Sequence, residues 1–241
     1  MANNRPDLGI LREFLSMPHV GEAVLKKFAA LPGAIGNSGG DMEGFVYVPG
    51  TREDGVLLVA HADTVGHEYD GIKLVETPDT IRNARGILGA DDRAGCAMLW
   101  LLRDLGHGLL LTDGEEYGGI GAEFLRWCCP DIFDEINRRY RFMIEIDRRG
   151  GGDFKCYNVG TEEFRAYVGQ KTAFTEPDRL RSTDIVYLCR DICGVNLSCG
   201  YYGEHTEAEY LKKSEWLHTL RLLKSWLSET DIPEFPLFGA G

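Results

Sequence analysis

Apolar residues recur along the chain with two different periods, and each period predicts a different kind of element. A spacing of three to four residues is typical of an amphipathic helix. Beyond the first thirty residues it predicts helices over 92–105, 118–127, 131–140, 183–193 and 206–227, while 161–168 fits a helix or a strand. Two further helices begin the chain, with apolar faces formed by Leu8, Leu11, Phe14, Leu15 and then Val24, Leu25, Phe28, Leu31.

Short apolar runs between turn residues predict strands. They lie at residues 44–48, 56–60, 72–76, 80–83, 109–112, 141–146 and 195–200. Because these runs alternate with the helical segments, we expect an α/β fold of three layers, α/β/α, around a central mixed, mostly parallel sheet. No repeat or linker interrupts the pattern, so residues 1–241 are expected to form a single domain.

Composition narrows the classes of partner. The 241 residues carry 38 acidic and 26 basic side chains, a net charge of −12, and no basic stripe that would neutralise nucleic-acid phosphates. No window is apolar enough to span a membrane, and the N-terminus lacks a secretory leader. Seven cysteines without a CxxC pair are read as reduced thiols. We therefore expect a cytoplasmic protein that binds neither nucleic acid nor membrane.

Metal-type ligands follow the apolar runs or tight turns at five places. Taken singly, each has an ordinary explanation, such as a helix cap, a dipole contact or a solvated loop. In an open α/β sheet, however, ligands bind beyond the carboxyl ends of the strands, where such residues would meet. The five places hold His61 with Asp63, Asp91 with Asp92, Glu115 with Glu116, Asp147, and His205.

Gathered at one sheet edge, these carboxylates would repel one another, and burying them unpaired costs several kcal/mol each. Bound cations would remove that cost. Imidazole and carboxylate without thiolate suits zinc, with cobalt or manganese as alternatives. Five ligands exceed the needs of one structural ion, so the set indicates two divalent metal ions sharing a bridging carboxylate.

The motifs HADTV, GADDRAG, TDGEEYGGIGA, EIDRRG and GEHTEAEYL resemble, in order, those of the co-catalytic di-zinc exopeptidases. That superfamily includes bacterial zinc aminopeptidases, peptidase T, carboxypeptidase G and the aminoacylases. The resemblance runs from about residue 55 to 227 and implies the zinc exopeptidase fold. It also implies that a water held between the metals attacks a peptide or aminoacyl substrate.

The resemblance assigns a role to each residue of the set. It implies that His61 and Asp147 bind the first metal, that Glu116 and His205 bind the second, and that Asp91 bridges them. Glu115 would be the general base, and Asp63 would steady His61. It also implies a cis peptide between Asp91 and Asp92. Glu145 is a rival for Asp147, which we prefer for its D-x-x-G context.

The spacing of the last two motifs favours one branch of the superfamily. Asp147 and His205 are 58 positions apart, which leaves no room for a lid domain of about 100 residues. This favours a zinc-dependent aminopeptidase. Arg148 and Arg149 could instead hold a substrate carboxylate, so a deacylase, carboxypeptidase or dipeptidase is the alternative. A non-catalytic metal-binding scaffold is a second alternative.

Overall fold

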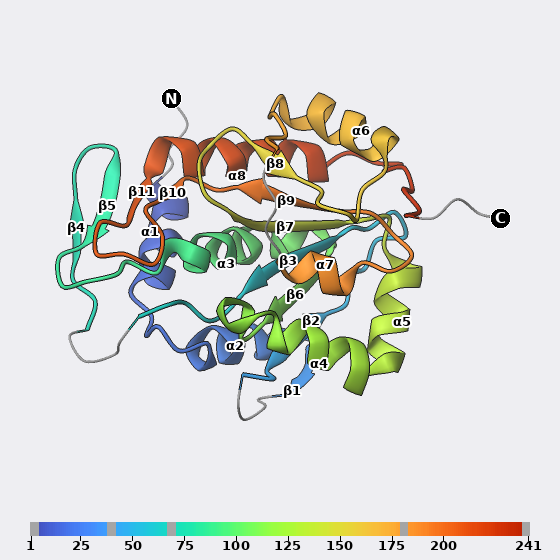
Figure 1. Cartoon of the computed structure of the whole chain (residues 1–241), viewed down its shortest axis with the longest axis horizontal. Coiled ribbons are helices and arrows are strands. Elements are labelled where there is room, and N and C mark those ends of the chain that lie inside the picture. The colour runs from blue at the N-terminus through green and yellow to red at the C-terminus, as the bar shows by residue number, and fades with distance from the viewer. Residues whose placement is uncertain (1–4, 38–41, 67–70, 179–182, 238–241) are drawn as a thin grey trace.

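A sheet of seven strands forms the centre of the molecule in the computed structural model (Figure 1). The structure describes residues 5–37, 42–66, 71–178 and 183–237. The strand order is β1-β2-β6-β3-β7-β9-β8. The four inner strands, β6, β3, β7 and β9, run parallel, and the outer strands pair antiparallel. The strands are β1 (Ile35–Asn37), β2 (Phe45–Val48), β3 (Leu57–His61), β6 (Gly108–Thr112), β7 (Met143–Arg148), β8 (Phe154–Lys155) and β9 (Gly194–Ser198).

Helices cover both faces of this sheet, which confirms the predicted three-layer fold. Alternate residues of a strand serve different faces: Leu58 packs in one hydrophobic cluster and Leu57 in the other. The first cluster joins the sheet to α1 (Arg5–Leu15), α2 (Glu22–Ala29), α3 (Ala90–Leu102), α6 (Glu162–Thr172) and α8 (Lys213–Leu227). The second joins it to α4 (Ile120–Cys128), α5 (Pro130–Arg139) and α7 (Asp184–Leu188).

A second sheet of four antiparallel strands, in the order β10-β11-β5-β4, lies at one end of the molecule, on the left in Figure 1. It combines β4 (Leu74–Glu76) and β5 (Thr80–Asn83) with β10 (Tyr201–Tyr202) and β11 (Tyr210–Lys212). Two short 3-10 helices, η2 (Arg103–Leu105) and η3 (Glu115–Tyr117), complete the described elements.

The prediction of one helix over 206–227 is wrong in its first part. Leu211 belongs to β11 and pairs with Ile81, and both side chains are fully buried. Asp79 then fixes the start of α8, because its carboxylate accepts a hydrogen bond from the Ser214 backbone N–H at 2.9 Å. The apolar residues before Lys213 match a helical face only by coincidence of spacing.

The helix predicted over 183–193 ends early, at Leu188. The buried side chain of Asn137 explains this end. Its amide donates to the Leu188 carbonyl at 3.1 Å and accepts from the backbone N–H of Arg190 at 2.9 Å. Residues 161–168, which fit either element, belong to α6, whose first turn is capped by the Thr161 hydroxyl. Among the described helices, none is both long and apolar enough to cross a bilayer.

Candidate metal centre and active site

The predicted residues meet where the parallel strands end. His61 is the last residue of β3, Asp147 lies near the end of β7, and Glu115 and Glu116 form the start of η3 just after β6. Asp91 lies in the first turn of α3, and His205 follows β10. A cavity of about 320 Å³ opens there, lined by Asp91, Glu115, Glu116, Asp147 and His205, with Arg148, Arg149, Tyr157, Asn196 and Glu204 among its other walls.

Asp91 divides its carboxylate between the two histidines. Its Oδ1 lies 3.1 Å from Nε2 of His61, and its Oδ2 lies 3.2 Å from Nε2 of His205. Beside the buried His61, Oδ1 of Asp147 lies 3.4 Å from Nε2 of that histidine. Beside the more exposed His205, Oε1 of Glu116 lies 2.8 Å from Nε2 of that histidine. Two groups of candidate ligands, one around His61 and one around His205, therefore share one carboxylate.

The spacing of these atoms fits divalent cations. Zinc binds imidazole nitrogen and carboxylate oxygen at about 2.0–2.2 Å in tetrahedral sites, so two ligands of one ion lie about 3.3–3.6 Å apart. The four distances given above run from 2.8 to 3.4 Å, close to that spacing. Ligand atoms of His61, Asp91 and Glu116 also lie within 4.8 Å of one another, as do those of His61, Asp92 and Asp147. This His/Asp/Glu cluster could hold a metal ion.

Asp63 connects two parts of the site through hydrogen bonds. Nδ1 of His61 lies 3.0 Å from the carbonyl oxygen of Asp63 and 3.3 Å from its Oδ1, which leaves Nε2 facing the carboxylates of Asp91 and Asp147. The same carboxylate accepts the backbone N–H groups of Glu115 and Glu116, each at 3.2 Å. One buried side chain thus orients an imidazole and positions both glutamates.

Asp147 is held by three side chains that the motifs did not single out. The Tyr201 hydroxyl donates to its Oδ1 at 3.1 Å, and the Thr183 hydroxyl donates to its Oδ2 at 3.4 Å. Asn196 accepts the Asp147 backbone N–H at 3.0 Å. Its rival, Glu145, is fully buried, and neither of its carboxylate oxygens meets a hydrogen-bond partner among the described residues.

The shifted pKa values of the site residues show how the negative charge of the carboxylates is balanced without cations. Hydrogen bonds to Asp91 and Glu116 raise the pKa of His205 to about 10. Burial opposes charge on His61, but Asp147 and the other carboxylates outweigh it and hold its pKa well above the ordinary value. Burial raises the pKa of Glu115 to about 9, and burial together with Asp91 raises that of Asp147 to about 7. Protons on the histidines thus supply part of the positive charge that the carboxylates require.

Two acidic residues near the centre had no role assigned from the sequence. Asp92 is fully buried and accepts backbone N–H groups from His61 at 3.3 Å and Gly95 at 2.9 Å. Glu209, which is 1% exposed, accepts the N–H groups of the segment that ends at Asp91. Both lie within quoted motifs, but a contact with a distant backbone leaves no spacing signal in the sequence. The peptide bond between Asp91 and Asp92 is cis, as the resemblance implied.

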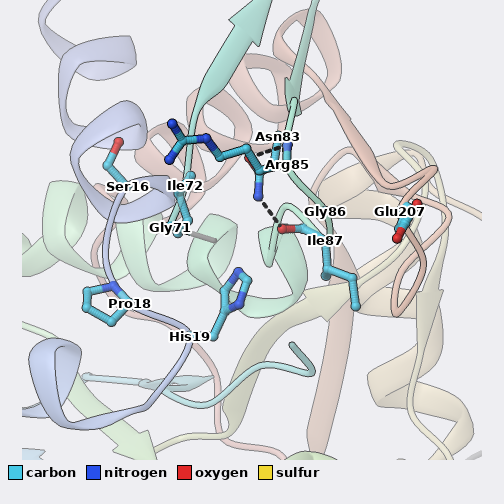
Figure 2. Close-up of a pocket in the computed structure, with 10 residues that line it drawn as sticks. All are labelled: Ser16, Pro18, His19, Gly71, Ile72, Asn83, Arg85, Gly86, Ile87 and Glu207. Atoms are coloured by element: carbon cyan, nitrogen blue, oxygen red, sulfur yellow. Dashed lines mark hydrogen bonds between the residues drawn. The ribbon is translucent and has the colours of Figure 1, made fainter. Parts of the chain in front are cut away.

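The two arginines after Asp147 line the cavity and are already paired. Nη2 of Arg148 lies 3.0 Å from Asp153, and Nη1 of Arg149 lies 3.0 Å from Glu204. A separate cavity of about 460 Å³ is bordered by the loop after α1, by the turn after β5 and by Glu207 (Figure 2). None of the seven predicted site residues lines this second cavity.

Comparisons with solved structures identify the fold. An aminopeptidase PepT from Bacillus cereus ATCC 10987 superposes with a TM-score of 0.66 at 16% identity, over 94% of this chain and 98% of that one. A tripeptidase from Staphylococcus aureus subsp. aureus Mu50 gives 0.66 at 14%, over 94% and 99%. An aminopeptidase from the archaeon Desulfurococcus kamchatkensis gives 0.65 at 13%, over 94% and 96%.

The fold expected from the motifs is therefore confirmed as that of these peptidases, while identities of 13–16% carry no further than the fold. No family model matches the chain. A search of the curated proteins likewise found no match.

Proposed function

We propose that the protein is a metal-dependent exopeptidase, an aminopeptidase that works with two divalent cations. Zinc is the metal that we propose first, with cobalt or manganese as alternatives. The observation that carries this proposal is the division of the Asp91 carboxylate between His61 and His205. His61, Asp91 and Asp147 would hold one cation, and His205, Glu116 and Asp91 the other. Such cations lower the pKa of a bound water and polarise the carbonyl that is attacked.

Glu115 is placed to act as the general base. Its backbone is fixed by Asp63, and its Oε2 lies 4.0 Å from Nε2 of His61, close to the ligands. In this role Glu115 takes a proton from the attacking water and returns it to the leaving amine. Positive charge beside it would bring its pKa down from about 9 toward neutrality, where a base works best.

Charge in the cavity favours substrates with a free amino group. Arg148 and Arg149 are each neutralised by a carboxylate, so neither offers an unpaired cation to a substrate carboxylate. The matched structures, two aminopeptidases and a tripeptidase, support the same choice. We further propose a single catalytic domain without a lid, since residues between Asp147 and His205 supply β8, α6, α7, β9 and β10.

The test compares aminoacyl-anilides with N-acylated amino acids in the presence of zinc, cobalt or manganese. We expect cleavage of the free-amine substrates, and loss of that cleavage in Glu115→Gln with metal content unchanged. Cleavage of blocked substrates alone would replace the aminopeptidase by a deacylase. A wild type that binds metal but cleaves neither class would support the non-catalytic scaffold.

A further inference from the structure

We propose that Glu209 is a positioning residue that holds residues 89–91, the Asp91 segment, against residues 203–209, the His205 loop. The two halves of the metal centre then keep their spacing. The inference rests on the proposed function, because it concerns the same pair of cations. Glu209 lies four residues beyond His205, and its carboxylate reaches a segment 118 to 120 positions earlier.

The contact is tight and shielded from water. Oε2 of Glu209 accepts the Gly89 N–H at 2.7 Å, and Oε1 accepts those of Ala90 at 2.8 Å and Asp91 at 3.2 Å. The first backbone N–H groups of a helix have no partner within the helix, and an anion at that end is favoured. Glu209 therefore satisfies three such donors at once, including that of Asp91 itself.

The Asp91 segment needs such support because its backbone departs from helical geometry. Gly89 has a φ of +70°, and Asp91 has a ψ of 102°. A Cβ at Gly89 would lie 3.0 Å from Thr64, so the segment is closely packed on its other side. Small shifts here would move the Asp91 carboxylate relative to both histidines.

Residues 83–87, which precede this segment, are also held by hydrogen bonds. Asn83, which is 8% exposed, donates to the Ile87 carbonyl at 2.9 Å and accepts from the backbone N–H of Arg85 at 3.1 Å (Figure 2). The chain from 83 to 91 is thus held by one buried side chain near its start and by Glu209 at its end.

The loop that carries His205 is closed on itself. Thr206 donates its hydroxyl to the Gly203 carbonyl at 2.7 Å, and the Glu209 N–H reaches the Thr206 carbonyl at 3.0 Å. Glu209 and His205 consequently belong to one compact turn. Fixing Glu209 to the Asp91 segment fixes the 3.2 Å distance between Asp91 Oδ2 and His205 Nε2.

The test variant is Glu209→Gln. Glutamine has nearly the same size, but an NH₂ group replaces one of the two accepting oxygens and would face a backbone N–H donor instead of accepting from it. Glu207→Gln is the matched control, because Glu207 is an exposed glutamate of the same loop that lines the separate cavity of Figure 2 and not the cavity of the metal centre. Metal is first removed from the full-length chains. Zinc is then titrated against a chromophoric competitor, and the thermal midpoint without metal is recorded for each chain.

We expect Glu209→Gln to bind zinc about 10–100-fold more weakly, as when a partner of a metal ligand is lost, and Glu207→Gln to match the wild type. Excess zinc should restore part of the lost kcat, while KM changes little. Glu209→Asp, which keeps the charge but is one methylene shorter, replaces the glutamine variant if that one does not fold, and should also bind more weakly.

Two results overturn the inference and are distinguishable from each other. If wild type and Glu209→Gln bind two zinc ions equally well, while only the thermal midpoint falls, Glu209 is purely structural and the proposed function stands. If the wild type itself binds no zinc, the proposed function fails and takes this inference with it.

Discussion

Zinc binding should expel protons, and the structure sets how many. Without cations, His205 has a pKa of about 10 and that of His61 is also well above its ordinary value. At pH 7 the His205 ring is therefore protonated, and the carboxylates around His61 favour its protonated form as well. Each ring must lose its proton before its Nε2 can bind a metal. Two ordinary histidines, with pKa values of about 6.5, would together release roughly half a proton at that pH.

Carboxyl groups add to the release. Asp147, with a pKa of about 7, is half protonated before metal binds. Glu115, with a pKa of about 9, loses its proton if the cations lower that pKa below neutrality. We therefore expect about two and a half protons per chain if Glu115 keeps its proton and about three and a half if it loses it, counting one proton for each protonated histidine and half a proton for Asp147.

Calorimetry measures this number directly. Zinc is titrated into the metal-free protein at pH 7 in several non-coordinating buffers that differ in ionisation enthalpy, and the slope of heat against that enthalpy gives the protons released. Apparent affinity should also rise with pH, since protons compete with the metal. Release of half a proton or less would refute the reasoning, because the histidines would then not be held protonated by the carboxylates.

Three further outcomes are expected. Tyr201→Phe removes a hydrogen bond to the Asp147 carboxylate and should weaken zinc binding about tenfold, the equivalent of about 1.4 kcal/mol; Tyr202→Phe, measured in the same competition assay, should not. A chelator should remove the metal at His205 before the metal at His61, since these side chains are 40% and 0% exposed, and stopped-flow traces with a single phase would contradict this. The metal-free protein should lose stability as pH rises toward 10, because the raised pKa of His205 stabilises the fold below about 6.5 and ceases to do so above about 10; urea unfolding from pH 6 to 10 measures it, and a flat profile would count against the ion pairs.

Much of the fold could be predicted because its signals are local. The inner strands β3, β6, β7 and β9 are almost entirely buried and rich in Leu, Ile and Val, as expected of strands covered on both faces. Errors arose where a distant contact decides the outcome. Leu211 fits the helical spacing of α8, yet pairing with Ile81 makes it a strand, and Asn137 ends α7 from another helix.

The site shows the same division. Residues that could bind metal lie at strand ends and turns, where their chemistry is visible in the sequence. Residues that hold them are ordinary in type and are recognised only by contact. Tyr201 and Thr183 reach Asp147, and Glu209 reaches the backbone at Asp91, across intervals that no motif records. Glu145 and Asp147 lie two residues apart on β7 but differ in their surroundings: Asp147 lines the 320 Å³ cavity, whereas Glu145 is fully buried.

The most direct test of the two-cation centre is anomalous diffraction from crystals of the zinc-loaded protein, recorded at the zinc edge. The account predicts two peaks about 3.5–4 Å apart, one on either side of the Asp91 carboxylate. One peak lies by His61 and Asp147, the other by His205 and Glu116. A single peak, or peaks away from Asp91, would contradict it.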